Sequence, residues 1–282
     1  MAASACVVLA ACTPTPAATT VPLPAKDRAA WTLPLTQYLP HNWEPADYAS
    51  TLLAADCMAK AGYSWKPPVE TIDPPGGESW NVGGRKLFNP ELAEKYGYGN
   101  SPMTVVPEQE TAAQRRFDES SVSIGQAGAD QLGACLHQGR KQLGWVADPT
   151  SYAQDLSLAA RPSRADEAAV KAASKRWRAC MRSAAVPDLP SDPNEMPSPS
   201  VDSSSGIDVI DRTASAHERQ VAVQDAKCQE SSGWAEAEYR AEWNAEVPLF
   251  QENADRLERY QRIRDRQAEE AMRIIAEHPV AG

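Results

Sequence analysis

Cysteines are the residues of this chain best suited to chemistry, and four of its six lie well inside the sequence. No C-x-x-C pair and no nearby histidine accompanies these four, so a metal site is a poor match. If the chain is exported, as the segment described next indicates, an even number of thiols instead predicts two disulfides. Three connectivities exist for four cysteines. We favour Cys57–Cys135 and Cys180–Cys228, because this choice keeps each bridge local. Each bridge would stabilise the fold by on the order of 4 kcal/mol.

A fifth cysteine, Cys12, ends a short apolar run. The segment Leu9-Ala10-Ala11-Cys12 resembles the lipobox of bacterial lipoproteins. The resemblance implies cleavage before Cys12, a diacylglyceryl group on its sulfur, and a location outside the cytoplasm. No basic residue precedes Lys26, which favours a translation start further upstream. The alternative is an alanine-rich N-terminus on a cytosolic protein.

These features divide the chain into four parts. We expect residues 1–11 to be the remnant of a signal peptide, and 12–30 to be a lipidated Pro/Thr/Ala tether with an extended backbone. Residues 31–160 would form a first helical unit with one disulfide, and 161–282 a second unit with the other disulfide. No later window is long and apolar enough for a transmembrane helix. The expected location is the outer face of the cytoplasmic membrane.

Composition excludes several classes of function. The formal net charge is −10, and no basic stripe interleaved with aromatic residues is present, which argues against nucleic acid as a partner. The four histidines are scattered. The sequence has no G-x-S-x-G, no phosphate-binding glycine loop and no G-x-G-x-x-G. It therefore predicts no catalytic residue, no metal and no cofactor, although an enzyme is not excluded.

One loop-rich segment, 63–110, holds the residues that could act on or bind a glycan. Its carboxylates Glu70, Asp73 and Glu78 accompany tryptophans, as in glycosidases, but acidic residues in a Pro/Gly-rich loop are usually solvated. The aromatic residues of this segment could form a ligand face for a glycan or a protein. We favour the other interpretation, in which they fill gaps between helices. The residues of this candidate face are Trp65, Trp80, Tyr96 and Tyr98.

Helical periodicity predicts a mainly α protein with long Pro/Gly-rich loops. We expect helices over 45–62 and 126–143, one opening at 162, one opening after Ser215, and a long C-terminal helix over 234–277. The four cysteines fall on the apolar faces of these helices. Strands are hard to find, apart from a short hairpin within 63–110. The segment 186–206, rich in Pro and Ser, predicts disorder.

The long C-terminal helix contains an interrupted heptad seam and a proline, Pro248, that should kink or break it. We favour packing of this seam on the helix's own domain over a coiled coil with another chain. The seam consists of Trp243, Val247, Phe250, Ala254, Leu257, Gln261, Arg264, Ala268, Ala271 and Ile275.

An internal duplication of a helix pair is plausible. Asp56-Cys57-Met58 and Ala179-Cys180-Met181 each end a helical segment, and in each half an Asp precedes the partner cysteine. In the second half this is Asp225, which could face inward with Arg178 as its cationic partner, or lie on the surface.

Several short motifs resemble a pattern in uncharacterised exported proteins of actinobacteria. They are residues 31–40, Gly62-Tyr63-Ser64-Trp65, Lys95-Tyr96-Gly97, and the Asp225 to Cys228 segment. The resemblance implies an envelope location and two disulfides, and it lends no activity. We therefore expect a non-catalytic binding or scaffolding component of the cell envelope. Its partners would be the membrane, through a lipid on Cys12, and a cell-wall glycan or an envelope protein. The alternatives are a glycan-binding module and a wall-modifying hydrolase.

Overall fold

The protein is mainly helical, as the periodicity predicted. The computed structural model describes residues 21–39, 45–68, 78–81, 83, 85–101, 108–144, 148–165, 167–201 and 214–279. Within these ranges it has eight α-helices and no strands. The helices are α1 (Pro45–Lys60), α2 (Pro90–Tyr96), α3 (Glu108–Ser123), α4 (Gly125–Gln142), α5 (Asp148–Ala165), α6 (Ala168–Met181), α7 (Ala216–Ser231) and α8 (Trp234–Glu277).

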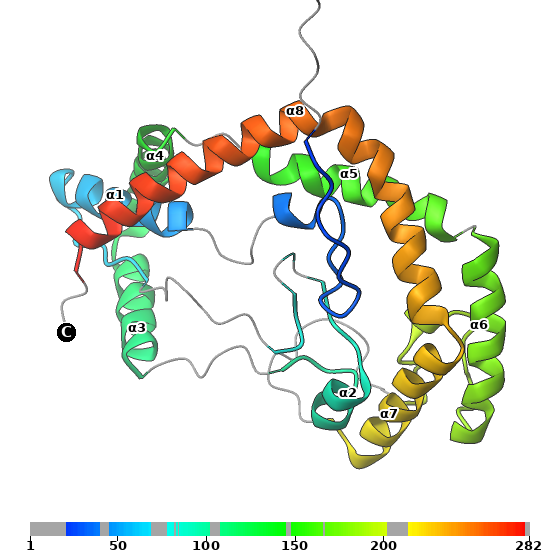
Figure 1. Ribbon diagram of the computed structural model, residues 1–282. Helices are drawn as coiled ribbons and strands as arrows, with labels where there is room; N and C mark the ends of the chain where they lie inside the picture. Colours follow the sequence, from blue (N-terminus) through cyan, green and yellow to red (C-terminus); the bar gives the residue numbers. More distant parts are fainter. Residues whose placement is uncertain are drawn as a thin grey trace, which may run out of the picture.

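The long helix α8 contacts α1, α5, α6 and α7 (Figure 1). Its C-terminal part packs on α1, α5 runs along it, and its N-terminal part packs on α6 and α7. The helix continues through Pro248 without a break, and Figure 1 shows it bent. A proline removes one backbone hydrogen bond and so favours such a bend. Because α1 packs on α8, and α2 packs on α7, contacts cross the boundary that we placed at residue 160.

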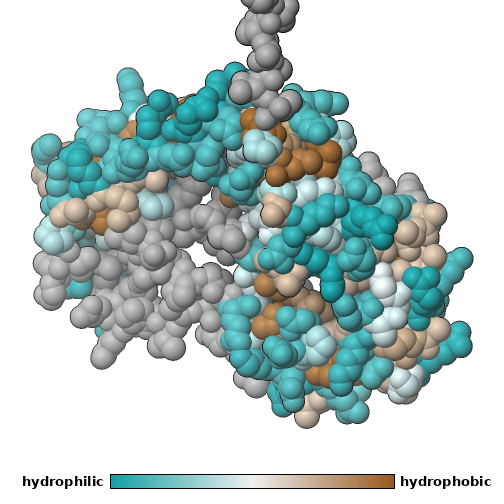
Figure 2. Space-filling model, viewed as in Figure 1, coloured by the Kyte–Doolittle hydropathy of each residue, from teal (hydrophilic) through white to brown (hydrophobic). Residues whose placement is uncertain are grey.

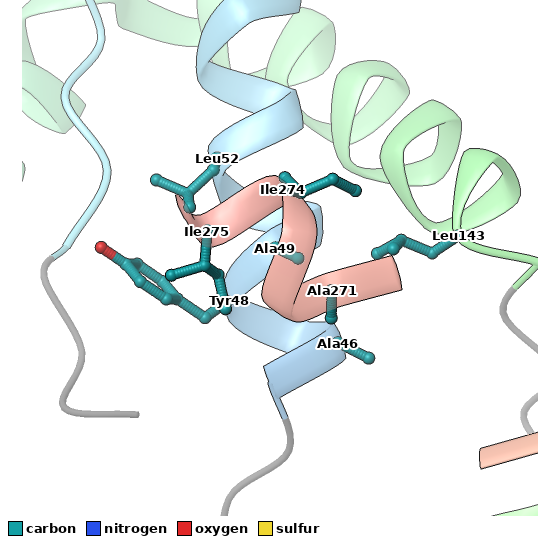
Figure 3. Packing of buried hydrophobic residues seen from close by; sticks show 8 residues of the cluster. All are labelled: Ala46, Tyr48, Ala49, Leu52, Leu143, Ala271, Ile274 and Ile275. Carbon is teal, nitrogen blue, oxygen red and sulfur yellow. The ribbon is translucent and has the colours of Figure 1, made fainter. Parts of the chain in front are cut away.

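At the C-terminal end of α8, small and branched side chains form a core with α1 (Figure 3). Alanines on both helices let the two backbones approach closely, and aliphatic side chains fill the space beside them. The cluster consists of Ala46, Tyr48, Ala49, Leu52, Leu143, Ala271, Ile274 and Ile275.

The heptad seam of α8 is used within the chain. Phe250 and Leu257 are buried against Leu35, Tyr38 and α5. The polar interruption of the seam also has a role inside the protein, since the Arg264 guanidinium donates to the Tyr38 carbonyl at 2.8 Å. The seam therefore supplies an internal core at these positions.

Both predicted disulfides are confirmed. Cys57 on α1 is bonded to Cys135 on α4, and Cys180 on α6 to Cys228 on α7, with Cα–Cα distances of 5.6 and 5.7 Å. Each bridge joins two helices that pack on each other. Two such bridges indicate an oxidising, extracytoplasmic environment. Among the described helices, none combines the length and the apolar character that crossing a bilayer requires. Cys12 and the tether up to residue 20 lie outside the described residues.

Helix boundaries differ most from expectation around Pro162. We expected a helix to open there, but residues 162–165 form the last turn of α5, and α6 begins at Ala168. A proline followed by a capping-type sequence marks a helix start equally well, which explains the error. On α6, Val170, Trp177 and Met181 are buried.

Two segments expected to be irregular have defined structure. The described part of 186–206, up to Val201, packs on α6 and α7 through Val186, Leu189 and Met196. Asp188 fixes it by accepting a hydrogen bond from the Ser198 hydroxyl at 2.6 Å. In the segment 63–110, the predicted hairpin is reduced, in its described part, to one antiparallel bridge between residues 80 and 86, and α2 follows it.

Candidate ligand-binding cavity

A cavity of about 910 Å³ lies between the N-terminal segment and the inner faces of α5, α7 and α8. Loop residues complete its wall, among them 81, 83, 85–89, 193, 194 and 196. The volume is within the range of small-molecule sites. The wall mixes aromatic, amide and charged side chains, which include Trp31, Phe88, Tyr98, Trp234, Asn81, Gln154, Arg85 and Glu242.

Three buried glutamates on one face of α8 hold the segments of this wall together. Glu238, Glu242 and Glu246 are spaced four residues apart, so they lie on one side of the helix. Their exposed fractions are only 1%, 4% and 3%. A buried carboxylate is costly unless donors satisfy it, so the partners of these three show what they do.

Glu242 binds two different segments of the wall. It accepts a hydrogen bond from the Trp31 indole N–H at 2.5 Å and forms an ion pair with Arg85 at 2.5 Å. Burial lowers the pKa of Arg85 to about 10, while Glu238 and Glu246 act in the opposite direction. The guanidinium also lies 4.5 Å from the centre of the Trp31 ring. One carboxylate thus holds the N-terminal segment and the loop around Arg85 together.

The other two glutamates hold further segments. Glu246 accepts from the Leu35 backbone N–H and from the Ser157 hydroxyl of α5, both at 3.0 Å. Glu238 accepts from the Asn194 side-chain amide at 3.2 Å. The three positions on α8 therefore bind four parts of the chain that are distant in sequence, and these parts form the wall.

Trp31 has a strained backbone at this site. Its φ of 51° is in the left-handed region, which a large side chain rarely adopts. The Tyr239 ring meets its indole edge-on, with ring centres 5.5 Å apart. The contacts with Tyr239, Arg85 and Glu242 hold Trp31 in this conformation.

Another buried acid, Asp225 of α7, also lines the cavity. It is fully buried and accepts hydrogen bonds from Trp177 at 2.7 Å, Tyr98 at 2.8 Å and Gln229 at 3.0 Å. Burial raises the pKa of Asp225 to about 6, although these three donors lower it. Of our two interpretations, the one in which Asp225 faces inward is confirmed. The proposed partner Arg178 is wrong, because it reaches the Leu189 carbonyl instead and neutral donors satisfy Asp225.

Hydrogen bonds and a ring contact hold Tyr98 in place. Its backbone N–H donates to the buried Glu218 at 3.0 Å, and its ring stacks on Phe88 with centres 5.5 Å apart. Burial and the nearby Asp225 raise the pKa of its hydroxyl, which keeps it a donor. Gly97 before it has φ of +60°, and a Cβ there would lie 2.7 Å from Glu218 Oε1. Only glycine fits this turn.

The candidate ligand face of Trp65, Trp80, Tyr96 and Tyr98 is not one surface. Trp65 is 5% exposed and packs among α1, α3 and α4, with its indole N–H on Ser121 at 3.2 Å. Tyr98 lines the cavity, and the Tyr96 hydroxyl donates to Glu78 at 2.6 Å. The interpretation of these aromatics as gap-filling residues therefore describes Trp65, while Tyr98 belongs to a different site.

The carboxylates considered for glycan hydrolysis do not form a site in the described structure. Glu70 and Asp73 lie outside the described residues. Glu78 is exposed and paired with Lys95, which lowers the pKa of this carboxyl, whereas a general acid needs a raised pKa. In the part of the chain that the structure describes, no group of three or more His, Cys, Asp or Glu is arranged to hold a metal ion.

Apolar surface is limited on the face drawn in Figure 2, where hydrophobic residues appear in small groups among hydrophilic ones. Among the described residues, the large hydrophobic ones that are exposed lie on different parts of the chain: Leu23, Val122, Leu158 and Met272. This distribution favours the cavity over an apolar docking face as the candidate site.

The fold and the cavity together define a helical protein with two disulfides and a ligand-sized cavity. Comparison with protein-family models, curated proteins and solved structures found no match.

Sequence reasoning missed the residues that build the wall, namely Trp31, Arg85 and the glutamates of α8. The one signal available was the spacing of Glu238, Glu242 and Glu246 beside Tyr239 and Trp243 on α8. Acidic residues are common along this helix, so spacing alone does not separate the buried ones from the solvated ones.

Proposed function

We propose that this protein is a lipid-anchored, extracytoplasmic binding protein of the cell envelope, and that it holds a small ligand in the cavity without catalysing a reaction. The observation that carries the proposal is that buried carboxylates of α7 and α8 bind the segments of the cavity wall. The proposal keeps the envelope location expected from the sequence. It moves the binding site from the loop aromatics to the cavity.

The non-catalytic role is supported by the hydrogen bonds that these acids accept from the protein itself. Glu242, Glu246 and Asp225 each accept hydrogen bonds from donors within the protein. A catalytic acid or base must instead reach the substrate with its proton-carrying oxygen. Carboxylates used in this way fix the shape of the wall before a ligand arrives, which lowers the entropic cost of binding.

The anchor rests on the resemblance of the segment ending at Cys12 to a lipobox. Eight residues, 13–20, separate Cys12 from the first described residue, Val21. From Cys12 to Val21 a fully extended backbone spans at most about 32 Å. A lipid on Cys12 would therefore keep the cavity close to the membrane surface, with access to ligands of the envelope.

The cavity can be tested by narrowing it at an exposed position. Ala29 is exposed and lines the cavity, whereas Ala25 is exposed and does not. We expect Ala29→Trp to weaken binding of the uncharged fluorescent probe N-phenyl-1-naphthylamine at least tenfold, and Ala25→Trp to leave it within twofold. Absence of saturable probe binding, or equal effects of the two variants, would contradict a binding cavity.

The anchor is tested separately by the mass and location of the protein expressed from its natural gene. We expect a membrane-bound species that starts at Cys12 and carries the lipid mass. Cys12→Ser should move the protein out of the membrane fraction. A wild-type protein recovered with an unmodified Cys12 would disprove the anchor and leave the cavity proposal standing.

A further inference from the structure

The charged residues around the cavity differ in how many of their hydrogen-bonding groups are already used. Four carboxylates and four cations of the described chain line it. Among the acids, Glu230 is bound by both terminal nitrogens of Arg28 at 2.9 Å, and Glu242 is bound by Arg85. Asp225 and Glu246 accept from neutral donors of the protein. All four carboxylates are therefore engaged by the protein itself.

One buried donor in the wall has no acceptor. Trp234, the first residue of α8, lines the cavity and is 4% exposed, and its indole N–H is buried without a hydrogen-bond partner among the described residues. A buried donor left without an acceptor costs about 1–3 kcal/mol, so such groups are rare and call for an explanation. An acceptor on a bound molecule would satisfy this one.

One cation at the cavity also lacks a partner. Arg161 near the end of α5 is exposed and lines the cavity, and within the described structure it makes no ion pair or hydrogen bond. Arg28 and Arg85, by contrast, are paired with Glu230 and Glu242. A free guanidinium is well suited to bind a carboxylate or phosphate through two parallel hydrogen bonds.

We infer that the cavity binds an organic anion: a carboxylate, sulfonate or phosphate group on an apolar or aromatic body. The anionic group would pair with the exposed Arg161 guanidinium, and a further acceptor of the ligand would take the Trp234 N–H. The body would contact apolar wall residues such as Leu33, Leu87 and Phe88. This inference rests on the proposed binding function and specifies the class of ligand.

A matched pair of probes tests the inference. 8-Anilinonaphthalene-1-sulfonate and N-phenyl-1-naphthylamine share one aromatic body, and only the first carries an anion. We expect the wild-type protein to bind the sulfonate at least tenfold more tightly. Arg161→Gln should weaken sulfonate binding about tenfold and leave the neutral probe within twofold. Arg182→Gln, at another exposed arginine that does not line the cavity, should change neither affinity.

Tryptophan variants test the buried donor. Trp234→Phe removes the N–H and keeps an aromatic ring, so we expect about fivefold weaker sulfonate binding. Trp80→Phe is the control, because the Trp80 N–H is also buried without a partner but does not line the cavity. Circular dichroism would verify that both variants fold. If Trp234→Phe unfolds, the Arg161 comparison still decides the question.

The outcomes separate this inference from the proposed function. If neither probe binds, or if Ala29→Trp fails to weaken the probes, the binding function itself is wrong. If both probes bind equally to the wild type, or Arg161→Gln has no effect on the sulfonate, the cavity binds ligands but not through an anion. Tighter sulfonate binding that Arg161→Gln reverses supports the inference.

Discussion

The indole N–H of Trp177 on α6 donates a 2.7 Å hydrogen bond to Asp225 on α7, and both side chains are fully buried. The same two helices are joined by the Cys180–Cys228 disulfide. A carboxylate at this position is satisfied by neutral donors alone, and its charge is isolated from water. The consequence is a dependence of stability on pH that can be measured.

Asp225→Asn should remove that dependence. The pKa of Asp225 is raised from 3.8 to about 6, so the folded protein retains a proton that the unfolded chain releases. Stability therefore falls as pH rises from about 4 to about 6, by on the order of 3 kcal/mol, and the loss persists at higher pH. Asparagine stays neutral. Its amide can accept from Trp177 and donate to the Tyr98 hydroxyl oxygen.

Urea unfolding of the wild type and of Asp225→Asn, at pH 4 and at pH 7, measures this effect. We expect the variant to gain stability relative to the wild type as pH rises. Asp130→Asn, at an exposed aspartate that also precedes a disulfide cysteine, should show no such change. A stability difference between Asp225→Asn and wild type that is the same at both pH values would contradict the explanation.

Removal of one partner from the Arg85–Glu242 pair should be strongly destabilising. Glu242 is 4% exposed, and Glu242→Leu would leave the Arg85 guanidinium and the Trp31 N–H without their acceptor. Breaking a buried pair costs about 3–5 kcal/mol, and we expect the lower end of this range because the Arg85 side chain is 31% exposed. Thermal and urea unfolding would report the loss. The pair of Glu270 and Arg273, whose side chains are 40% and 52% exposed, is the control, and Glu270→Leu should have little effect.

The sequence predicted well those parts of the fold that depend on local periodicity. The four cysteines lie on predicted helices, and the pairing that keeps each bridge local is correct. Ser215, after which we expected a helix to open, caps α7 by accepting from the Glu218 N–H at 3.0 Å. By contrast, α3 has few apolar residues, and its contacts to the rest of the protein include a serine, Ser120, that binds the backbone N–H of Lys66. Periodicity does not reveal a helix of this kind.

The cavity could not be predicted for a different reason. Its wall joins Trp31, Arg85 and Glu242, which are far apart in sequence, and each residue type alone is typical of a solvated surface or of a core. Only the packing of the loops on α8 shows that Glu242 is buried. Burial of a charge depends on tertiary contacts, and no local pattern records those contacts.

Each disulfide should contribute separately to stability. Replacement of Cys57 and Cys135 together by alanine should lower the free energy of unfolding by up to about 4 kcal/mol, and replacement of Cys180 and Cys228 together should have a similar effect. Before reduction, none of the four thiols should react with iodoacetamide in the unfolded protein, and after reduction all four should react. Labelling of any of them before reduction would contradict the bridges.

His278 should stabilise the end of α8 most at acidic pH. Its ring bonds the Ile274 carbonyl at 2.7 Å and Asp56 of α1 at 3.0 Å, and these contacts raise the pKa of His278 above its usual 6.5. The stabilisation is complete below pH 6.5 and is lost as pH rises through the raised pKa. The melting temperature of His278→Ala should therefore fall further below wild type at pH 5.5 than at pH 8.5. The exposed His217→Ala should show no difference.

Leu257 distinguishes an internal core from an interface with another chain. It occupies the heptad seam of α8, is 1% exposed, and packs on Leu35, Tyr38 and Phe250 of the same chain. Leu257→Ala should therefore lower the free energy of unfolding by about 2–5 kcal/mol without any change in the mass of the native species. Met272→Ala, at a position 45% exposed on the same helix, should cost far less. Urea unfolding and light scattering would measure the two quantities. A change in native mass with unaltered unfolding of the monomer would show that the seam binds another chain.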